Sequence, residues 1–144
     1  MATEQSKALI SRFNEEVWNK GNLAVIDEVF AGDCVWHSAP PGMPANRDGL
    51  RQMIAGFRGA FSEARSTVDE QIAEGDKVAW RWTFEGKHTG ELMGIPPTGR
   101  RVTFTGVSID RIVGGRSVER RDSADMLGLM QQLGAIPAPA QAPA

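Results

Sequence analysis

Two strand-like runs around a pair of glycines constrain the fold of this chain more than any other feature. The runs cover residues 101–113 and 116–125, and Gly114 and Gly115 lie between them. β-branched residues flank the glycines and favour extended backbone, and glycine supplies the positive φ angles that tight hairpin turns require. The sequence therefore predicts a long β-hairpin, with Asp122 at the far end of its second strand, where the carboxylate can point into a hollow.

A second strong strand is predicted over residues 77–84. Side chains alternate between the two faces of a strand, so Trp80, Trp82 and Phe84 share one face. Three aromatic rings in a row form a large apolar wall. Weak alternation over residues 66–73 predicts a further strand, joined to this one by a turn.

Four amphipathic segments are predicted to be helical because apolar residues recur in them every three or four positions. They cover Gln5–Asn19, Leu23–Phe30, Arg47–Phe61 and Met126–Leu133. Asn22 is the expected N-cap of the second helix, and Asn46 or Asp48 that of the third. Asp125 is expected in the N-terminal turn of the last helix, near the positive end of its dipole.

The remaining segments read as a short strand and two loops. The strand covers residues 34–38 and ends at a proline-rich loop, residues 39–44, which fits the rim of a pocket. Residues 85–100 are glycine-rich and are expected to form a functional loop or a bulged crossing. Helices followed by antiparallel strands predict an α+β fold, in which helices across a strongly curved sheet would enclose an apolar cone.

Composition predicts one globular domain and excludes several kinds of partner. The 144 residues are 41% apolar and 24% charged, which is ordinary for a soluble protein. We expect a single domain over residues 1–134 and a disordered, Pro/Ala-rich tail over residues 135–144. The net charge of −2, without basic runs, argues against nucleic acid, and the lack of an 18-residue apolar run argues against a membrane span.

The cysteine and histidine content carries further expectations. Cys34 is the only cysteine, so no disulfide can form within the chain, and a cytoplasmic location is the default. It is expected to be a small buried hydrophobe. His37 and His88 are far apart and lack a spaced carboxylate pattern, so no metal site is predicted.

Several motifs resemble those of the SnoaL-like polyketide cyclases, ester cyclases of the nuclear transport factor 2-like superfamily. The motifs are Gly90-Glu-Leu-Met-Gly-Ile-Pro-Pro-Thr-Gly-Arg100, Asp110-Arg-Ile-Val-Gly-Gly-Arg116, Arg121-Asp122 and Leu129-Met-Gln-Gln-Leu-Gly134. The resemblance extends from the first helix to Gly134. It implies a cone-shaped α+β barrel of a curved antiparallel sheet with N-terminal helices, assembled as a homodimer or homotetramer. The ligand in the cone would be a hydrophobic small molecule such as an aromatic polyketide.

The resemblance also implies a catalytic role for Asp122. In the characterised cyclases, an aspartate on the last strand is the general acid/base for an intramolecular aldol closure, and the register of the motifs aligns Asp122 with it. Two companions differ: Ser108 stands where those cyclases carry histidine, and His37 where they carry asparagine.

One carboxyl group can serve an aldol closure because it can take a proton α to a carbonyl and then protonate the new alkoxide. A proton between two carbonyls is acidic enough that no cofactor or metal is required. Arg120 shares strand parity with Asp122, and its guanidinium would favour the charged carboxylate. Asp122 could instead be a structural carboxylate paired with arginine.

Eight further residues are candidates for contact with the substrate. They are His37, Met53, Phe57, Trp80, Trp82, His88, Ser108 and Arg120. Core packing is the alternative for the apolar ones, and a structural hydrogen bond is the alternative for each histidine.

Two other functions remain open at this level. Epoxide hydrolysis would require an arginine between two carboxylates, which Arg120 with Asp122 and Asp110 could supply if Asp110 faces the cavity. A non-catalytic binding or dimerisation module would have a cone filled by its own tryptophans. A cavity that reaches Asp122 would favour an enzyme.

Overall fold

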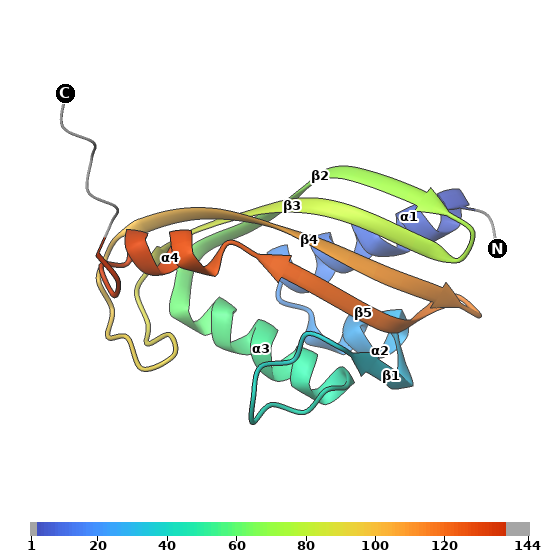
Figure 1. Cartoon of the computed structure of the whole chain (residues 1–144), viewed down its shortest axis with the longest axis horizontal. Coiled ribbons are helices and arrows are strands. Elements are labelled where there is room, and N and C mark those ends of the chain that lie inside the picture. The colour runs from blue at the N-terminus through green and yellow to red at the C-terminus, as the bar shows by residue number, and fades with distance from the viewer. Residues whose placement is uncertain (1–2, 138–144) are drawn as a thin grey trace.

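A five-stranded sheet with strand order β1-β5-β4-β3-β2 is the framework of the computed structural model, which describes residues 3–137 (Figure 1). The strands are β1 (Phe30–Trp36), β2 (Phe61–Glu74), β3 (Lys77–His88), β4 (Arg101–Val113) and β5 (Arg116–Ala124). Neighbouring strands are antiparallel except β1, which pairs with β5 in parallel. The sheet is curved and does not close into a barrel, and the α+β class is confirmed.

Helices cover the concave face of this sheet and one of its ends (Figure 1). They are α1 (Thr3–Phe13), the π-helix η1 (Asn14–Asn19), the 3₁₀ turn η2 (Leu23–Val25), α2 (Ile26–Val29), α3 (Arg47–Ala60) and α4 (Met126–Gln132). The Asn46 side chain caps α3 by accepting hydrogen bonds from the backbone N–H groups of Asp48 and Gly49. Asp125 caps α4 through the N–H of Gly128, 2.9 Å away, as expected.

The predicted hairpin is confirmed. Gly114 and Gly115 turn the chain between β4 and β5 with φ angles of 61° and 82°. The register then places Ser108 opposite Asp122 and, two residues toward the turn, Asp110 opposite Arg120. This pairing brings four polar side chains together on the concave face.

The first predicted helix begins as the α-helix α1 and continues from Asn14 as the π-helix η1. The N–H of Lys20 bonds to the carbonyl of Glu15, five residues earlier. This wider winding brings Asn14 and Asn19 to the same side, where both amides donate to the carbonyl of Ser66 at 2.9 Å. The N–H of Ser66 donates back to Asn19 at 2.7 Å. A contact with β2 therefore decides the helix form.

The second predicted helix forms over residues 23–29, as a 3₁₀ turn followed by a short α-helix, and ends one residue before its predicted end. The Asn22 side chain makes no capping bond, contrary to expectation, and the strand expected from residue 34 already begins at Phe30. Extended backbone at Phe30 directs its ring into the core, where it packs edge-on against Phe13 at 5.2 Å. Burial of this ring outweighs the local helical pattern.

Strands β2 and β3 are longer than predicted. β2 starts at Phe61 and β3 continues to His88, so the loop expected over residues 85–100 shortens to 89–100. The register of β2 shifts between Ser62 and Arg65 and again between Val68 and Glu70. Each such bulge breaks the two-residue period, which is why the sequence signal was weak.

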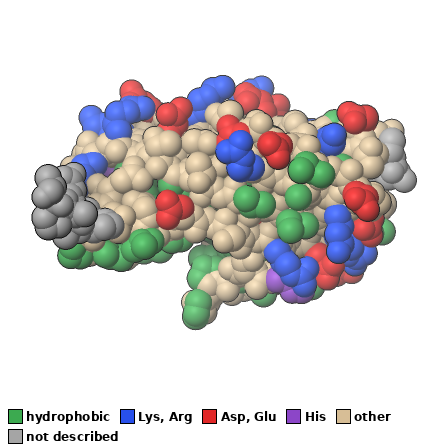
Figure 2. All heavy atoms as spheres, turned by 45° about the horizontal axis from the view of Figure 1, so that its top comes forward, with side chains coloured by type: hydrophobic (Ala, Val, Ile, Leu, Met, Phe, Trp, Pro, Cys, Tyr) green, Lys and Arg blue, Asp and Glu red, His purple; other side chains and the backbone are tan. Residues whose placement is uncertain are grey.

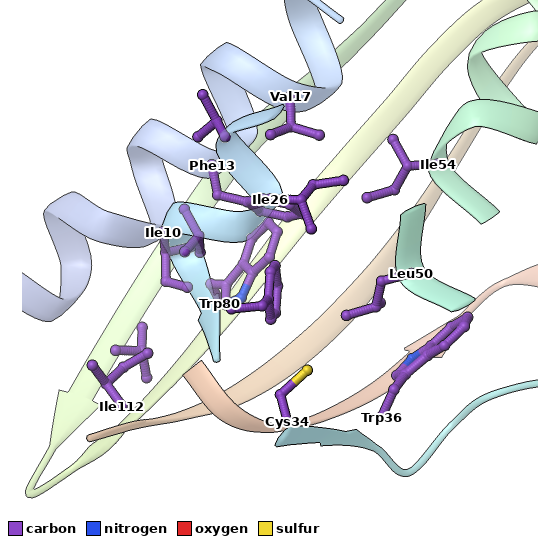
Figure 3. Packing of buried hydrophobic residues seen from close by; sticks show 14 residues of the cluster. Ile10, Phe13, Val17, Ile26, Cys34, Trp36, Leu50, Ile54, Trp80 and Ile112 are labelled. Carbon is purple, nitrogen blue, oxygen red and sulfur yellow. The ribbon is translucent and has the colours of Figure 1, made fainter. Parts of the chain in front are cut away.

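The buried core forms two clusters along the concave face. The first contains Phe13 from α1, Leu50 and Ile54 from α3, Trp80 from β3 and the buried Cys34 from β1 (Figure 3). The second lies at the end of the sheet near α4 and contains Phe61, Phe84, Phe104, Leu129 and Leu133. Trp18 and Trp82 pack against both clusters. Within residues 3–137, no helix has the length and apolar character needed to cross a bilayer.

Candidate active site

A cavity of about 600 Å³ lies between the concave face of the sheet, α3 and the two loops at residues 37–46 and 89–100. This volume suits a small-molecule ligand. Six of the predicted contact residues line it together with Asp122. They are Met53, Phe57, Trp80, Trp82, Ser108 and Arg120. The wall is mostly aromatic and apolar, and the polar side chains of Ser108, Arg120 and Asp122 share one place in it.

The two histidines lie outside the cavity lining. His88 is fully buried at the end of β3, where its Nδ1 accepts a hydrogen bond from the backbone N–H of Thr98 at 3.2 Å. His37 lies at the surface, with its Nε2 3.3 Å from an Oε1 atom of Glu119. His88 therefore ties the glycine-rich loop to the sheet, and neither histidine belongs to the candidate site.

Asp122 is held by two donors at the cavity wall. The indole Nε1–H of Trp36 donates to its Oδ2 at 2.7 Å, and the hydroxyl of Ser108 donates to its Oδ1 at 2.7 Å. Its backbone N–H donates to Ser38 Oγ at 2.7 Å. The side chain is 20% exposed. Two bonds fix the orientation of the carboxylate and leave acceptor capacity free toward the cavity.

Trp82 sets the direction of the bond from Ser108. Its Nε1–H donates to Ser108 Oγ at 3.0 Å. An indole N–H can only donate, so the hydroxyl hydrogen of Ser108 remains free to point at Asp122. Trp82, Ser108 and Asp122 therefore form a chain of two hydrogen bonds, and the donor of each bond points toward the carboxylate.

A buried ion pair lies beside this chain of hydrogen bonds. Arg120 donates from Nε to Oδ1 of Asp110 at 3.1 Å and from Nη2 to Oδ2 at 3.0 Å. Its guanidinium lies over the rings of Phe13, Phe30 and Trp80, with distances to the ring centres of 4.9, 5.0 and 5.3 Å. Burial alone would lower the pKa of Arg120, but the negative charges of Asp110 and Asp122 outweigh it and raise the pKa. Arg120 therefore stays charged, and the carboxylate of Asp110 balances its charge.

Asp110 is completely buried behind Arg120 and does not line the cavity. An arginine between two carboxylates is present, because Arg120 Nε also lies 3.8 Å from Oδ1 of Asp122. Only Arg120 and Asp122 reach the cavity, however. A water molecule there would meet one of the two carboxylates that flank Arg120, which weighs against the epoxide hydrolase alternative.

Trp36 and Ser38 are site residues that the sequence reasoning did not single out. His37 lies between them in the sequence, but Cys34, Trp36 and Ser38 occupy alternate positions and so share the opposite face of this segment. Cys34 and Trp36 are buried, so the side chains on this face of the segment point into the molecule. The two-residue period of a strand was the signal that could have found them.

Comparisons with known proteins agree with this architecture. The sequence model of the family "SnoaL-like polyketide cyclase" matches residues 8–133. The chain is 34% identical over 119 residues to the nogalonic acid methyl ester cyclase of Streptomyces nogalater, an alignment that covers 81% of this chain and 89% of that protein. It is 38% identical over 76 residues to the aklanonic acid methyl ester cyclase DnrD of Streptomyces peucetius, which is 52% of each chain.

A solved structure provides a further comparison. AclR of Streptomyces galilaeus, described as a candidate hydroxylase, superposes with a TM-score of 0.86 and 31% identity, covering 97% of this chain and 87% of that one. From the family match and the two cyclase relatives together, we conclude that this chain belongs to the SnoaL-like polyketide cyclase family.

Proposed function

We propose that this protein is a polyketide ester cyclase that needs no cofactor and closes a ring by an intramolecular aldol reaction, with Asp122 as general acid/base. One observation carries the proposal: Asp122 is a carboxylate held in a fixed orientation at the wall of an apolar cavity large enough for a substrate. Two relatives are named for methyl esters of nogalonic and aklanonic acid. A hydrophobic ester with several carbonyl groups is the matching substrate class.

The proposed reaction conserves atoms and protons. The Asp122 carboxylate takes a proton from a carbon between two carbonyl groups, and the resulting enolate carbon attacks a ketone of the same molecule. The new carbon–carbon bond leaves an alkoxide, which takes the proton back from Asp122. Trp36 and Ser108 hold the carboxyl group in place for both proton transfers.

Replacing Asp122 by Asn tests the proposal. Asparagine keeps the shape of the side chain but cannot carry the proton, so we expect kcat to fall about a thousandfold while the Kd for the substrate changes little. Turnover of polyketide methyl esters is followed by absorbance, and binding by tryptophan fluorescence. Asp33→Asn, an exposed change on β1, is the matched control. Full activity of the Asp122→Asn protein would remove the proposal.

A second candidate is hydroxylation of a ring of the same substrate class, in which dioxygen would supply the oxygen atom and an added two-electron reductant would reduce the second oxygen atom to water. The likeness to AclR favours it, and so does Ser108, which stands at a position where the cyclases carry histidine. Mass spectrometry of the product separates the two functions. Aldol closure leaves the mass of the substrate unchanged, whereas hydroxylation adds one oxygen atom.

A homodimer formed through the outer face of the sheet is the proposed assembly. Ile72, Val107 and Ile109 are exposed there by 62%, 44% and 42%. The register aligns Ile72 and Ile109 on either side of Ala79, so that they form one row across three strands. Hydrophobic side chains gather in a group bordered by charged ones in the view of Figure 2. Such a patch on a sheet favours pairing with a second copy.

A further inference from the structure

Arg120 has two carboxylates within reach but is hydrogen-bonded to one of them. Its Nε and Nη2 bond to Asp110 at 3.1 and 3.0 Å, whereas the distance from Nε to Asp122 Oδ1 is 3.8 Å. The two acids lie on neighbouring strands, Asp110 on β4 and Asp122 on β5. The guanidinium therefore makes its hydrogen bonds to the acid that cannot reach a ligand and none to the acid that can.

The other donors around Asp110 reinforce this choice. Ser117 Oγ donates to its Oδ1 at 2.8 Å, and Trp80 Nε1 donates to its Oδ2 at 3.0 Å. With the two bonds from Arg120, each oxygen of Asp110 accepts two hydrogen bonds, which saturates a carboxylate. Asp122 accepts one at each oxygen, from Ser108 and Trp36. Asp110 has its acceptor sites filled as the counter-ion of Arg120, whereas Asp122 keeps acceptor sites open toward the cavity.

We propose that Asp110 is a positioning residue for Asp122: by holding Arg120 in a bidentate pair, it prevents the guanidinium from pairing with the acid/base group. The inference rests on the proposed function of Asp122. A bidentate pair between Arg120 and Asp122 would occupy both carboxylate oxygens and make them a weaker base.

If Asp110 were removed, Asp122 would be the acidic partner left to Arg120. The guanidinium is confined by the rings of Phe13, Phe30 and Trp80, and Asp122 is the remaining acid beside it. The other titratable groups that face this place are the buried thiol of Cys34 on β1 and Glu91 on the loop at the cavity. The charges of Arg47 and Arg120 both act on the thiol of Cys34, and Glu91 lines the cavity. Neither residue is changed in any variant below.

The test measures the acid–base titration of Asp122 itself. Carbon-13 labelling of the aspartate carboxyl groups allows NMR to follow this titration without substrate, with the Asp122→Asn protein used for assignment. In Asp110→Asn we expect the titration midpoint of Asp122 to move about one pH unit lower, because Arg120 now pairs with it. We also expect kcat to fall about tenfold, with little change in KM and with the acid limb of the pH profile moved in the same direction.

A double variant keeps the test decisive where Asp110→Asn does not fold. Asp110→Asn with Arg120→Gln removes both charges of the pair together, a change that buried ion pairs often tolerate. We expect its Asp122 midpoint to lie close to that of the unmodified protein, since the pair is neutral as a unit. A midpoint about one unit higher would mean that Arg120 already serves Asp122, and would overturn the proposal. Asp33→Asn is the control for the loss of an aspartate.

The outcomes separate this inference from the proposed function. A folded Asp110→Asn protein whose Asp122 titrates as before would refute the role of Asp110, even where Asp122→Asn has lost its turnover. Conversely, a shifted titration together with an active Asp122→Asn protein would uphold the arrangement of charges and reject Asp122 as the acid/base group.

Discussion

At the scale of single residues, three tryptophans combine two tasks at the cavity. Trp36, Trp80 and Trp82 form part of its apolar wall, and their indole N–H groups donate to Asp122, Asp110 and Ser108 respectively. An indole offers one donor and no acceptor, so each bond has a fixed direction. The chain contains no tyrosine, and these indoles supply the aromatic donors at the site.

Cys34 carries a prediction at the same scale. Burial raises the pKa of its thiol, and the opposing charges of Arg47 and Arg120 are weaker effects. Folding thus favours the protonated thiol. Below the thiol pKa of the unfolded chain, this contribution to stability is complete. As the pH rises above that value, about 8.5, the unfolded chain loses its proton first and the contribution declines until the folded thiol titrates.

Two measurements check this expectation. Urea unfolding at neutral pH and at about pH 9.5 should show a smaller loss of stability with pH for Cys34→Ala than for the unmodified protein. A thiol reagent should label Cys34 quickly in denaturant and slowly in the native state, because only 4% of the residue is exposed. Rapid labelling of the native protein would contradict the buried, protonated thiol.

At the scale of elements, the π-helix η1 depends on its contact with β2. Asn19→Ala removes two hydrogen bonds between its side chain and the backbone of Ser66 and leaves the N–H of that residue without this acceptor. We expect the free energy of unfolding to fall by about 1–3 kcal/mol, measured by urea denaturation. Asn22→Ala is the matched control, because its exposed side chain makes no capping bond, and a change below about 0.5 kcal/mol is expected. Equal effects of the two changes would refute the role of the contact.

At the scale of the whole molecule, the open sheet has an inner face that builds the cavity and an outer face that carries the proposed dimer contact. Ile109→Lys places a charge in the exposed apolar row, so we expect the mass measured by light scattering to fall from dimer to monomer. Leu127→Lys on α4 is the control, since Leu127 is similarly exposed, at 58%, but lies outside this row. A monomeric unmodified protein, or an Ile109→Lys protein that remains dimeric, would exclude this surface.

Local patterns in the sequence were enough to determine the hairpin around Gly114 and Gly115 and the wall made by Trp80 and Trp82. Both depend on short-range physics, namely the φ angles of a turn and the alternation of side chains along a strand. Helix ends and bulged strands were less predictable, because Ser66 and the core around Phe30 decide them through contacts with residues distant in the sequence.

Only the tertiary structure decided which partners surround Asp122. Parallel pairing of β1 with β5 brings Trp36 to a carboxylate 86 residues away, and the register of β4 against β5 places Asp110 behind Arg120. Periodicity in the sequence determines which face of a strand a side chain occupies, but not which strand lies beside it. That choice follows from burial of apolar surface over the whole chain, because only the packed sheet removes those side chains from water.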